Sequence, residues 1–232
     1  MGASRRESAG PGIAFSGWSS SSVHRAMLFL RASRAASMLL FLNASPPTTP
    51  APIARPGMTV AVVGDGAVGL LGVLSAKRMG AERIIVMSRH ASRQKLAREF
   101  GATDIVTERG DEGVSRIKEL TDGIGADAVL ECVGTQESMM QAVRSTRPGG
   151  YVGYVGVPHG VEINGGELFF AHVHLHGGPA PVRRYLPELI DLVWNGKINP
   201  GKVFDLTLPL DQVAEGYRAM DERSAIKTLL LP

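Results

Sequence analysis

The sequence from Gly57 onward predicts an α/β fold, a doubly wound parallel sheet of about six strands covered by helices on both faces. Two observations support this prediction. Short apolar runs alternate strictly with segments of helical apolar period, which implies right-handed crossovers between parallel strands. The first apolar run also leads directly through a glycine-rich turn into a helical segment. Residues 57–200 are therefore expected to form one domain.

The β-α units of this domain follow one another along the chain. Apolar runs rich in Val and Ile indicate buried parallel strands, which we expect at 58–63, 84–87, 104–106, 128–131, 151–155 and 173–176. Helical periods predict helices at 67–79, 92–100, 111–120, 136–145 and 184–194. Arg147-Pro148-Gly149-Gly150 is a turn signal before the fifth strand. The C-terminal tail, 201–232, is expected to hold a strand at 203–208, a helix at 211–220 and a strand at 226–231.

Residues 1–56 differ from the rest in composition. They are rich in Ser, Ala, Arg and Pro and lack a sustained apolar period, which predicts a disordered segment. They carry six Arg against the single acid Glu7, whereas the remainder has 19 basic and 21 acidic residues. The basic balance thus belongs to this leader, and we expect no nucleic-acid binding by the folded part. Three interpretations stay open: a targeting segment, a natural tail, or sequence read from a wrong frame or start.

The sequence predicts neither a membrane span nor a disulfide. The longest apolar run, 26–42, is interrupted by Arg31 and Arg34, so no run approaches the roughly 20 apolar residues that a spanning helix needs. Cys132 is the only cysteine, which excludes a disulfide within the chain and a site with several thiolate ligands. Cysteine usage favours a reducing compartment, and we expect a cytoplasmic protein with no membrane partner.

The glycine-rich turn is Gly64-Asp65-Gly66-Ala67-Val68-Gly69. Between a strand and a helix, this spacing predicts a dinucleotide-binding turn of the Rossmann type. Gly64 would permit the tight turn, Gly66 would let the backbone approach a pyrophosphate, and Gly69 would let the helix pack closely on the sheet. The free N–H groups of the helix would then face the phosphates. A plain turn is the alternative interpretation.

The second strand ends in Ser88-Arg89-His90, where an NAD site places a carboxylate for the ribose hydroxyls. No carboxylate is present there. A small Ser88 followed by Arg89 leaves room for a ribose 2′-phosphate with a cation beside it, and Arg93 could add a second cation. We therefore predict NADP(H) rather than NAD(H) as the cofactor. The alternative is a pair of solvated arginines where the helix begins.

Two further features have alternative chemical interpretations. His172, His174 and His176 alternate and would share one face of a strand, as in some metal sites. Because no carboxylate or thiolate accompanies them, we interpret this segment as an ordinary edge or interface strand. Cys132 follows a buried strand and is interpreted as a small packing residue near the cofactor rather than a nucleophile.

Several segments together resemble the zinc-containing alcohol dehydrogenases of the medium-chain dehydrogenase/reductase superfamily, with a likeness from about Pro56 to the C-terminus. The segments are 60–69, 99–104 (Glu99-Phe100-Gly101-Ala102-Thr103-Asp104), 130–134 (Leu130-Glu131-Cys132-Val133-Gly134) and 147–150. The resemblance implies that the nicotinamide and its ribose are lined by Cys132, Val133, Gly134, Val155, Gly156 and Val157. It also implies that Lys227 contacts the pyrophosphate.

The sequence departs from that family in one respect. The family has a preceding GroES-like domain that supplies the catalytic zinc ligands, including a Cys and a Gly-His-Glu motif, and these are not found here. The resemblance implies hydride transfer between nicotinamide and an alcohol or aldehyde in the complete family protein. We expect no catalytic or metal-binding residues in this chain, and activity of the chain alone is an open question.

Three functions remain as alternatives. The chain is the NADP(H)-binding part of an alcohol dehydrogenase whose front half was lost from the recorded sequence, or it is a non-catalytic NADP(H)-binding module. A methyltransferase on a similar fold is disfavoured, because it usually has an acid where Ser88 stands. By the resemblance, 203–208 and 226–231 pair within the missing domain, so here they would pair with each other, dock loosely or promote association. Phe170–His176 is the candidate homodimer interface.

Overall fold

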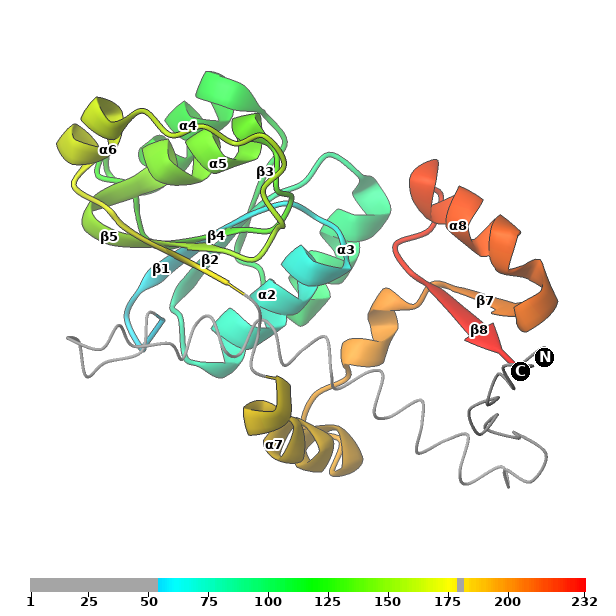
Figure 1. Ribbon diagram of the computed structural model, residues 1–232. Helices are drawn as coiled ribbons and strands as arrows, with labels where there is room; N and C mark the ends of the chain where they lie inside the picture. The colour runs from blue at the N-terminus through cyan, green and yellow to red at the C-terminus, as the bar shows by residue number, and fades with distance from the viewer. Residues whose placement is uncertain (1–53, 179–181) are drawn as a thin grey trace, which may run out of the picture.

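The computed structural model describes residues 54–178 and 182–232, so the expectations for residues 1–53 lie outside the described residues. A six-stranded parallel sheet has the order β3-β2-β1-β4-β5-β6 (Figure 1). The predicted α/β fold with a doubly wound sheet is confirmed. The elements are β1 (Thr59–Val63), α2 (Ala67–Arg78), β2 (Arg83–Met87), α3 (Ala91–Phe100), β3 (Asp104–Val106), α4 (Gly110–Glu119), β4 (Ala126–Glu131), α5 (Gln136–Ser145), β5 (Thr146–Tyr154), α6 (Gly165–Ala171), β6 (His174–Gly177) and α7 (Val182–Trp194).

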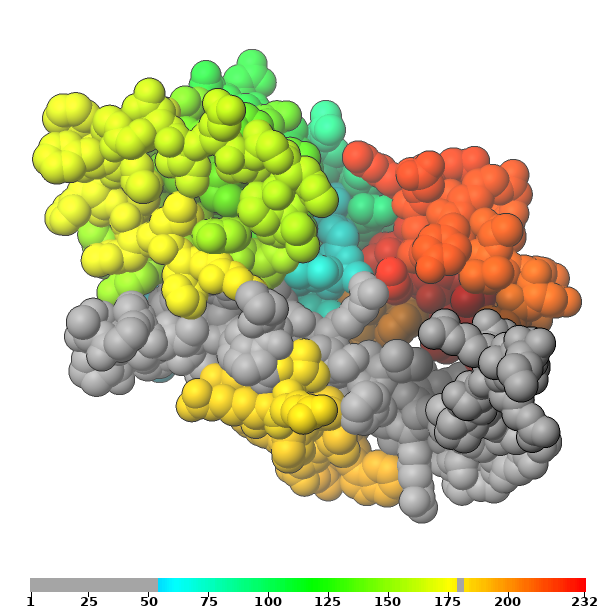
Figure 2. Space-filling model, viewed as in Figure 1, coloured from blue at the N-terminus to red at the C-terminus, as the bar shows by residue number. Residues whose placement is uncertain are grey.

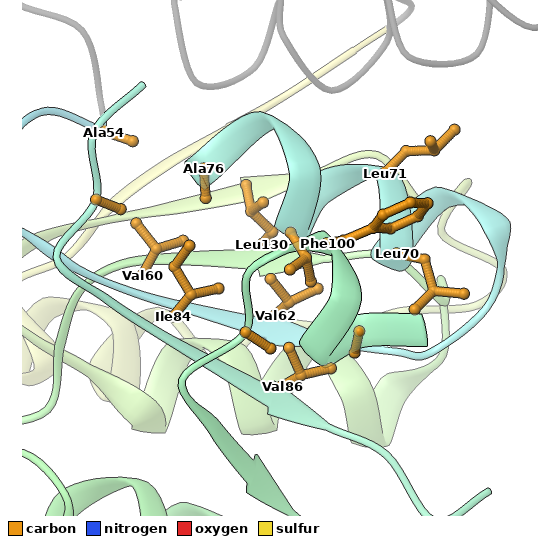
Figure 3. Close-up of a cluster of buried hydrophobic side chains, with 14 of the residues drawn as sticks. Ala54, Val60, Val62, Leu70, Leu71, Ala76, Ile84, Val86, Phe100 and Leu130 are labelled. Carbon is orange, nitrogen blue, oxygen red and sulfur yellow. The ribbon is translucent and has the colours of Figure 1, made fainter. Parts of the chain in front are cut away.

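The sheet has an apolar layer on each face, because alternate strand residues point to opposite sides. In β1, Val60 and Val62 pack with Leu70 of α2 and Phe100 of α3 (Figure 3). Ala61 and Val63 belong to the opposite layer, together with residues of α4 and α5. Strands buried on both faces explain why the sequence shows continuous apolar runs here instead of alternation.

The buried core begins before the expected boundary at Gly57. Ala54 is fully buried in the layer that contains α2 and α3 (Figure 3). The side chain of Pro56 lies close to Gly80, at the end of the first β-α unit. Ala54 and Pro56, expected to belong to the leader, therefore pack on the domain.

The turn predicted at Arg147-Pro148-Gly149-Gly150 is instead part of β5. The register with β4 moves from Ala126 opposite Thr146 to Ala128 opposite Tyr151, so the added residues bulge out of the strand. Gly149 has a φ of +74°, a left-handed conformation that the bulge requires. The glycine-rich segment does depart from regular strand geometry, but it lies inside β5 and does not separate two elements.

The strand predicted at 173–176 is observed one residue later, at His174–Gly177, and His172 lies outside it. His172 ends α6 with a φ of +50°, so only His174 and His176 lie on β6. The α6 helix was not predicted; the side chain of Asn164 caps it by accepting a hydrogen bond from the N–H of Glu167 at 3.1 Å. Seven residues are too few to show a helical apolar period.

The C-terminal unit, which we define as residues 206–231, is a second and smaller β-α-β arrangement. It contains β7 (Leu206–Pro209), η2 (Leu210–Gln212), α8 (Val213–Asp221) and β8 (Thr228–Leu231). The two strands pair with each other in parallel, one of the outcomes expected for these segments. The unit lies beside the end of the main sheet that carries α3 (Figures 1 and 2).

The segment that leads into the C-terminal unit packs against α2 and α3. The single turn η1 (Pro200–Val203) places Val203 in the core layer of α2, and Phe204 and Ile226 pack against the same layer. Lys202 forms an ion pair with Glu99 on α3. Within the described ranges, no helix is long and apolar enough to cross a membrane.

Candidate functional site

A cleft of about 560 Å³ opens at the carboxyl ends of β1, β2, β3 and β4. The strand order reverses between β1 and β4, and ligands of open α/β sheets bind at such a reversal. The cleft is lined by Val63, Gly64, Asp65, Gly66, Arg89, His90, Arg93, Arg109, Cys132, Val133, Thr135, Glu137, Ser138, Gln141 and Arg223.

The glycine-rich turn forms one wall of the cleft, and its geometry suits a dinucleotide. Gly64 has a φ of +115°. A Cβ on Gly69 would lie 1.9 Å from the carbonyl oxygen of Gly64, so α2 can approach the turn only because residue 69 has no side chain. A Cβ on Gly66 would meet no atom within 4 Å, which leaves open space where α2 begins. A phosphate can therefore reach the N-terminus of the helix.

Asp65, the second residue of this turn, is a site residue that the sequence analysis missed. Its carboxylate accepts hydrogen bonds from Ser88 Oγ at 2.7 Å, His90 Nδ1 at 2.9 Å and Arg93 Nη1 at 3.2 Å. Burial would raise the pKa of Asp65, but the hydrogen bonds from His90 and Ser88 and the charge of Arg93 together lower it. The carboxylate is thus ionised, and it joins the glycine turn to the end of β2.

The arginines of the cleft differ in their contacts. Arg93 is buried, and it donates to Asp65 and, at 3.4 Å, to the backbone carbonyl of Arg223. Arg89 is exposed and lines the cleft beside it. Arg109 and Arg223 also line the cleft and were not predicted. Arg109 could have been found, because it follows β3 and the ends of neighbouring parallel strands meet; Arg223 lies outside the β-α series and had no such signal.

The loop after β4 is held by a buried carboxylate. Glu131 is fully buried, and its Oε1 accepts from the N–H groups of Val133 and Gly134, both at 2.8 Å. Gly134 has a φ of +92°, and a Cβ there would lie 2.4 Å from the carbonyl oxygen of Val157. Burial and the nearby Glu131 raise the pKa of the Cys132 thiol. A protonated, partly buried thiol fits the interpretation of Cys132 as a packing residue.

The predicted cofactor residues fall into three groups. Seven line the cleft: Gly64, Gly66, Arg89, His90, Arg93, Cys132 and Val133. Others lie next to it, in the first turn of α2, beneath Asp65 or around the loop after β4: Ala67, Val68, Gly69, Ser88, Gly134, Val155, Gly156 and Val157. Lys227 is outside the lining; it precedes β8, and its backbone N–H donates to Asp205 at 3.1 Å.

The histidines of β6 do not form a metal site. His174 stacks on Tyr151, with 4.7 Å between the ring centroids. Across residues 54–178 and 182–232, no group of three or more His, Cys, Asp or Glu residues could hold a metal ion. The described residues therefore do not fit a zinc ion, and we assign no step to one.

Known proteins have similar sequences and folds. The zinc-binding dehydrogenase family matches residues 67–195, more than half of the chain. A probable zinc-binding alcohol dehydrogenase of Mycobacterium tuberculosis is 38% identical over 171 residues, covering 72% of this chain and 43% of the relative. An NADP-dependent isopropanol dehydrogenase of Entamoeba histolytica is 35% identical over 176 residues, covering 73% of this chain and 48% of the relative.

Solved structures agree with these relatives. The alcohol dehydrogenase TADH from Thermus sp. ATN1 superposes with a TM-score of 0.75 at 29% identity, covering 88% of this chain and 59% of that structure. The chain thus spans about half the length of the relatives it matches. Its sheet, glycine turn and cleft correspond to the nucleotide-binding half of alcohol dehydrogenase-like oxidoreductases. The chain belongs to the zinc-binding dehydrogenase family.

Proposed function

We propose that the cleft binds NADP(H) in preference to NAD(H), as the nucleotide-binding part of an alcohol dehydrogenase-like oxidoreductase. The observation that carries the proposal is the end of β2, where Ser88 replaces the carboxylate of an NAD site and Arg89 faces the cleft. Ser88 is fully buried and donates to Asp65, so it leaves space at this position. The NADP-dependent relative of Entamoeba histolytica supports the same cofactor.

The chain's own residues account for binding and orientation of such a cofactor. The nicotinamide supplies the hydride chemistry when the dinucleotide is bound. The turn at Gly64 to Gly66 would receive the pyrophosphate, and Arg89 would pair with the 2′-phosphate. Cys132 and Val133, held by Glu131, would lie along the nicotinamide and its ribose. In this arrangement the chain positions the cofactor, and the residues that act on an alcohol come from elsewhere in the complete enzyme.

A second function remains, a non-catalytic NADP(H)-binding module. It is favoured by the loop that directly follows β4, where Cys132 contributes a protonated thiol and Val133 an exposed apolar side chain. Neither is an acid or base suited to deprotonating an alcohol. The two functions differ in one assay: the module binds NADPH and turns over no alcohol under any condition, whereas the dehydrogenase half regains turnover with its complementing domain.

We also propose that copies of the chain associate through the edge of the sheet at β6. In the described part of the chain, β6 pairs with β5 alone. Phe169 and Phe170, in the preceding helix, are 78% and 85% exposed. Apolar side chains next to an open sheet edge favour pairing with a second copy.

The experiment that tests the cofactor proposal is a fluorescence titration of the purified chain with NADPH and, separately, NADH. We expect tighter binding of NADPH, and an Arg89→Ala variant that loses roughly tenfold in NADPH affinity while NADH affinity stays nearly constant. The control is Arg116→Ala, because Arg116 on α4 is outside the cleft and pairs with Glu119. Equal affinities for the two cofactors would contradict the proposal.

A further inference from the structure

Three guanidinium groups of the cleft have no carboxylate partner within the described ranges. The side chains of Arg89, Arg109 and Arg223 make no hydrogen bond or ion pair with another described residue. By contrast, Arg83 is paired with Asp104 and Arg147 with Asp127. Unpaired cations gathered at one cleft are costly to maintain unless an anion binds among them.

Arg109 shows this cost most clearly. Its Nη1 atom is buried and has no hydrogen-bond partner. Burial lowers the pKa of Arg109, and the charge of Arg89 lowers it further. A buried donor without an acceptor requires an explanation, and at the wall of an open cleft a water or a ligand oxygen can supply the acceptor. The charges of Asp65 and Glu137 act in the opposite direction, but neither accepts a hydrogen bond from this Nη1 atom; an anion that did so would also offset the repulsion between Arg109 and Arg89.

The position of Arg223 depends on Arg93. Arg223 comes from the C-terminal unit, just after α8, and has a φ of +60°. Arg93 bridges the two regions, because one of its nitrogens donates to Asp65 and another to the carbonyl oxygen of Arg223. One hydrogen of each nitrogen is therefore engaged. This geometry fits a positioning residue that holds the backbone of Arg223.

The charge of the whole cleft suits a phosphate dianion. Its lining includes four arginines and two carboxylates, Asp65 and Glu137, which leaves a formal excess of two positive charges. Asp65 is already bonded to Arg93, Ser88 and His90. Of the arginines that can contact an anion, Arg89 and Arg109 follow β2 and β3, and Arg223 comes from the C-terminal unit. The end of β2 is where the proposed cofactor would place its ribose phosphate.

We propose that Arg109 and Arg223 join Arg89 in binding the 2′-phosphate of NADP(H), and that Arg93, held by Asp65, positions Arg223. The inference rests on the proposed cofactor, but it concerns different residues. A phosphomonoester carries three acceptor oxygens and nearly two negative charges, enough for three guanidinium partners. Arg223 makes the preference for NADP(H) dependent on the C-terminal unit.

The test measures dissociation constants of NADPH and NADH for Arg109→Gln and Arg223→Gln. We expect NADPH affinity to fall about tenfold or more for Arg109→Gln and several-fold for the more exposed Arg223→Gln, with NADH affinity within about twofold of the original. The matched controls are Arg116→Gln on α4 and Arg218→Gln on α8, each paired with a glutamate outside the cleft. Circular dichroism and the urea midpoint report whether each variant is folded.

The outcomes separate this inference from the cofactor proposal. If the unsubstituted chain shows no preference for NADPH, both are overturned. If it prefers NADPH and Arg89→Ala removes the preference while Arg109→Gln and Arg223→Gln retain it, only the inference is overturned. An equal loss for both cofactors would place these arginines on the pyrophosphate, which also overturns the inference.

The positioning role of Arg93 has its own test, a double-mutant cycle on the ratio of NADPH to NADH affinity. Arg93→Gln should lower that ratio, and it should lower it no further when Arg223 is already Gln, because Arg93 acts through Arg223. Additive losses would mean that Arg93 contacts the phosphate itself and would overturn this part of the inference. Because the readout is a ratio, a partial loss of folded protein that weakens both cofactors equally does not alter it.

Discussion

The main sheet and the C-terminal unit are both built from parallel β-α-β connections, but they bury their strands to different extents. In β4, five of six residues are buried, whereas β7 and β8 contain no buried residue. Leu210 and Tyr217 of the unit are 57% and 68% exposed. A pair of strands with one helix cannot enclose a core, so the unit depends on the surfaces it contacts. The six-stranded sheet carries its own core on both faces.

This difference in burial matters because both regions contribute residues to the cleft. The glycine turn, Asp65 and Arg89 belong to the well-buried sheet. Arg223 belongs to the C-terminal unit and reaches the cleft through the bond from Arg93 to its carbonyl oxygen. Regions with little buried apolar area open locally at low free energy. The phosphate-binding end of the cleft is therefore expected to be coupled to the less stable part of the molecule.

The largest expected effect compares one leucine from each region. Leu130, in β4, is fully buried, whereas Leu230, in β8, is only partly buried. Leu130→Ala should lower the free energy of unfolding by about 2–5 kcal/mol, because it leaves a cavity in the core. Leu230→Ala should cost about 1 kcal/mol or less. Urea denaturation measures both, and equal losses would show that the two regions share one cooperative core.

A smaller effect is expected at the link between the regions. Asp65→Asn weakens the bonds from Arg93, Ser88 and His90, and should cost about 1–2 kcal/mol at pH 7. The folded pKa of Asp65 is below its unfolded value, so its stabilisation is complete above about pH 4 and is lost as the pH falls through the folded pKa.

The difference in the free energy of unfolding between the original chain and the Asp65→Asn variant should therefore shrink as the pH falls below about 4. Urea denaturation at a series of pH values measures it. Asp211→Asn is the matched control, because Asp211 is exposed in η2 of the C-terminal unit, and it should stay within about 0.5 kcal/mol. If the difference in the free energy of unfolding for Asp65→Asn stayed constant down to pH 2, the effect could not be assigned to this carboxylate.

The same contrast explains what the sequence could and could not predict. Apolar runs and helical periods located the strands and helices of the main sheet, because strands buried on both faces leave a strong pattern. The short α6 and the bulge of β5 were missed, since they depend on Asn164 as a cap and on the register with β4. Local sequence patterns carry little information about such tertiary contacts.

The site residues also divide into those that sequence position predicts and those that only the structure reveals. Gly64, Gly66 and Arg89 were predicted because their roles follow from positions next to a strand end. Asp65 occupies a variable position of the glycine motif, and its importance comes from three partners that lie 23 to 28 residues away. Arg223 meets Arg93 across 130 residues. The glycine motif does not specify residue 65, and no spacing rule links Arg93 to residue 223, so these two residues required the structure.

The smallest effect on the free energy of unfolding is expected for substitutions of exposed aromatic residues. Their effect on dimer formation shows which of the two regions contacts a second copy. Phe170→Ser next to β6 and Tyr217→Ser on α8 should each change the free energy of unfolding by less than about 0.5 kcal/mol, because both side chains are mostly exposed. If copies pair through the β6 edge, light scattering will show less dimer for Phe170→Ser and an unchanged mass for Tyr217→Ser. Trp194→Ser, on α7, is the control for removing an exposed aromatic ring. A lower dimer fraction only for Tyr217→Ser would mean that the C-terminal unit, the region without its own core, gains its missing burial from a second copy.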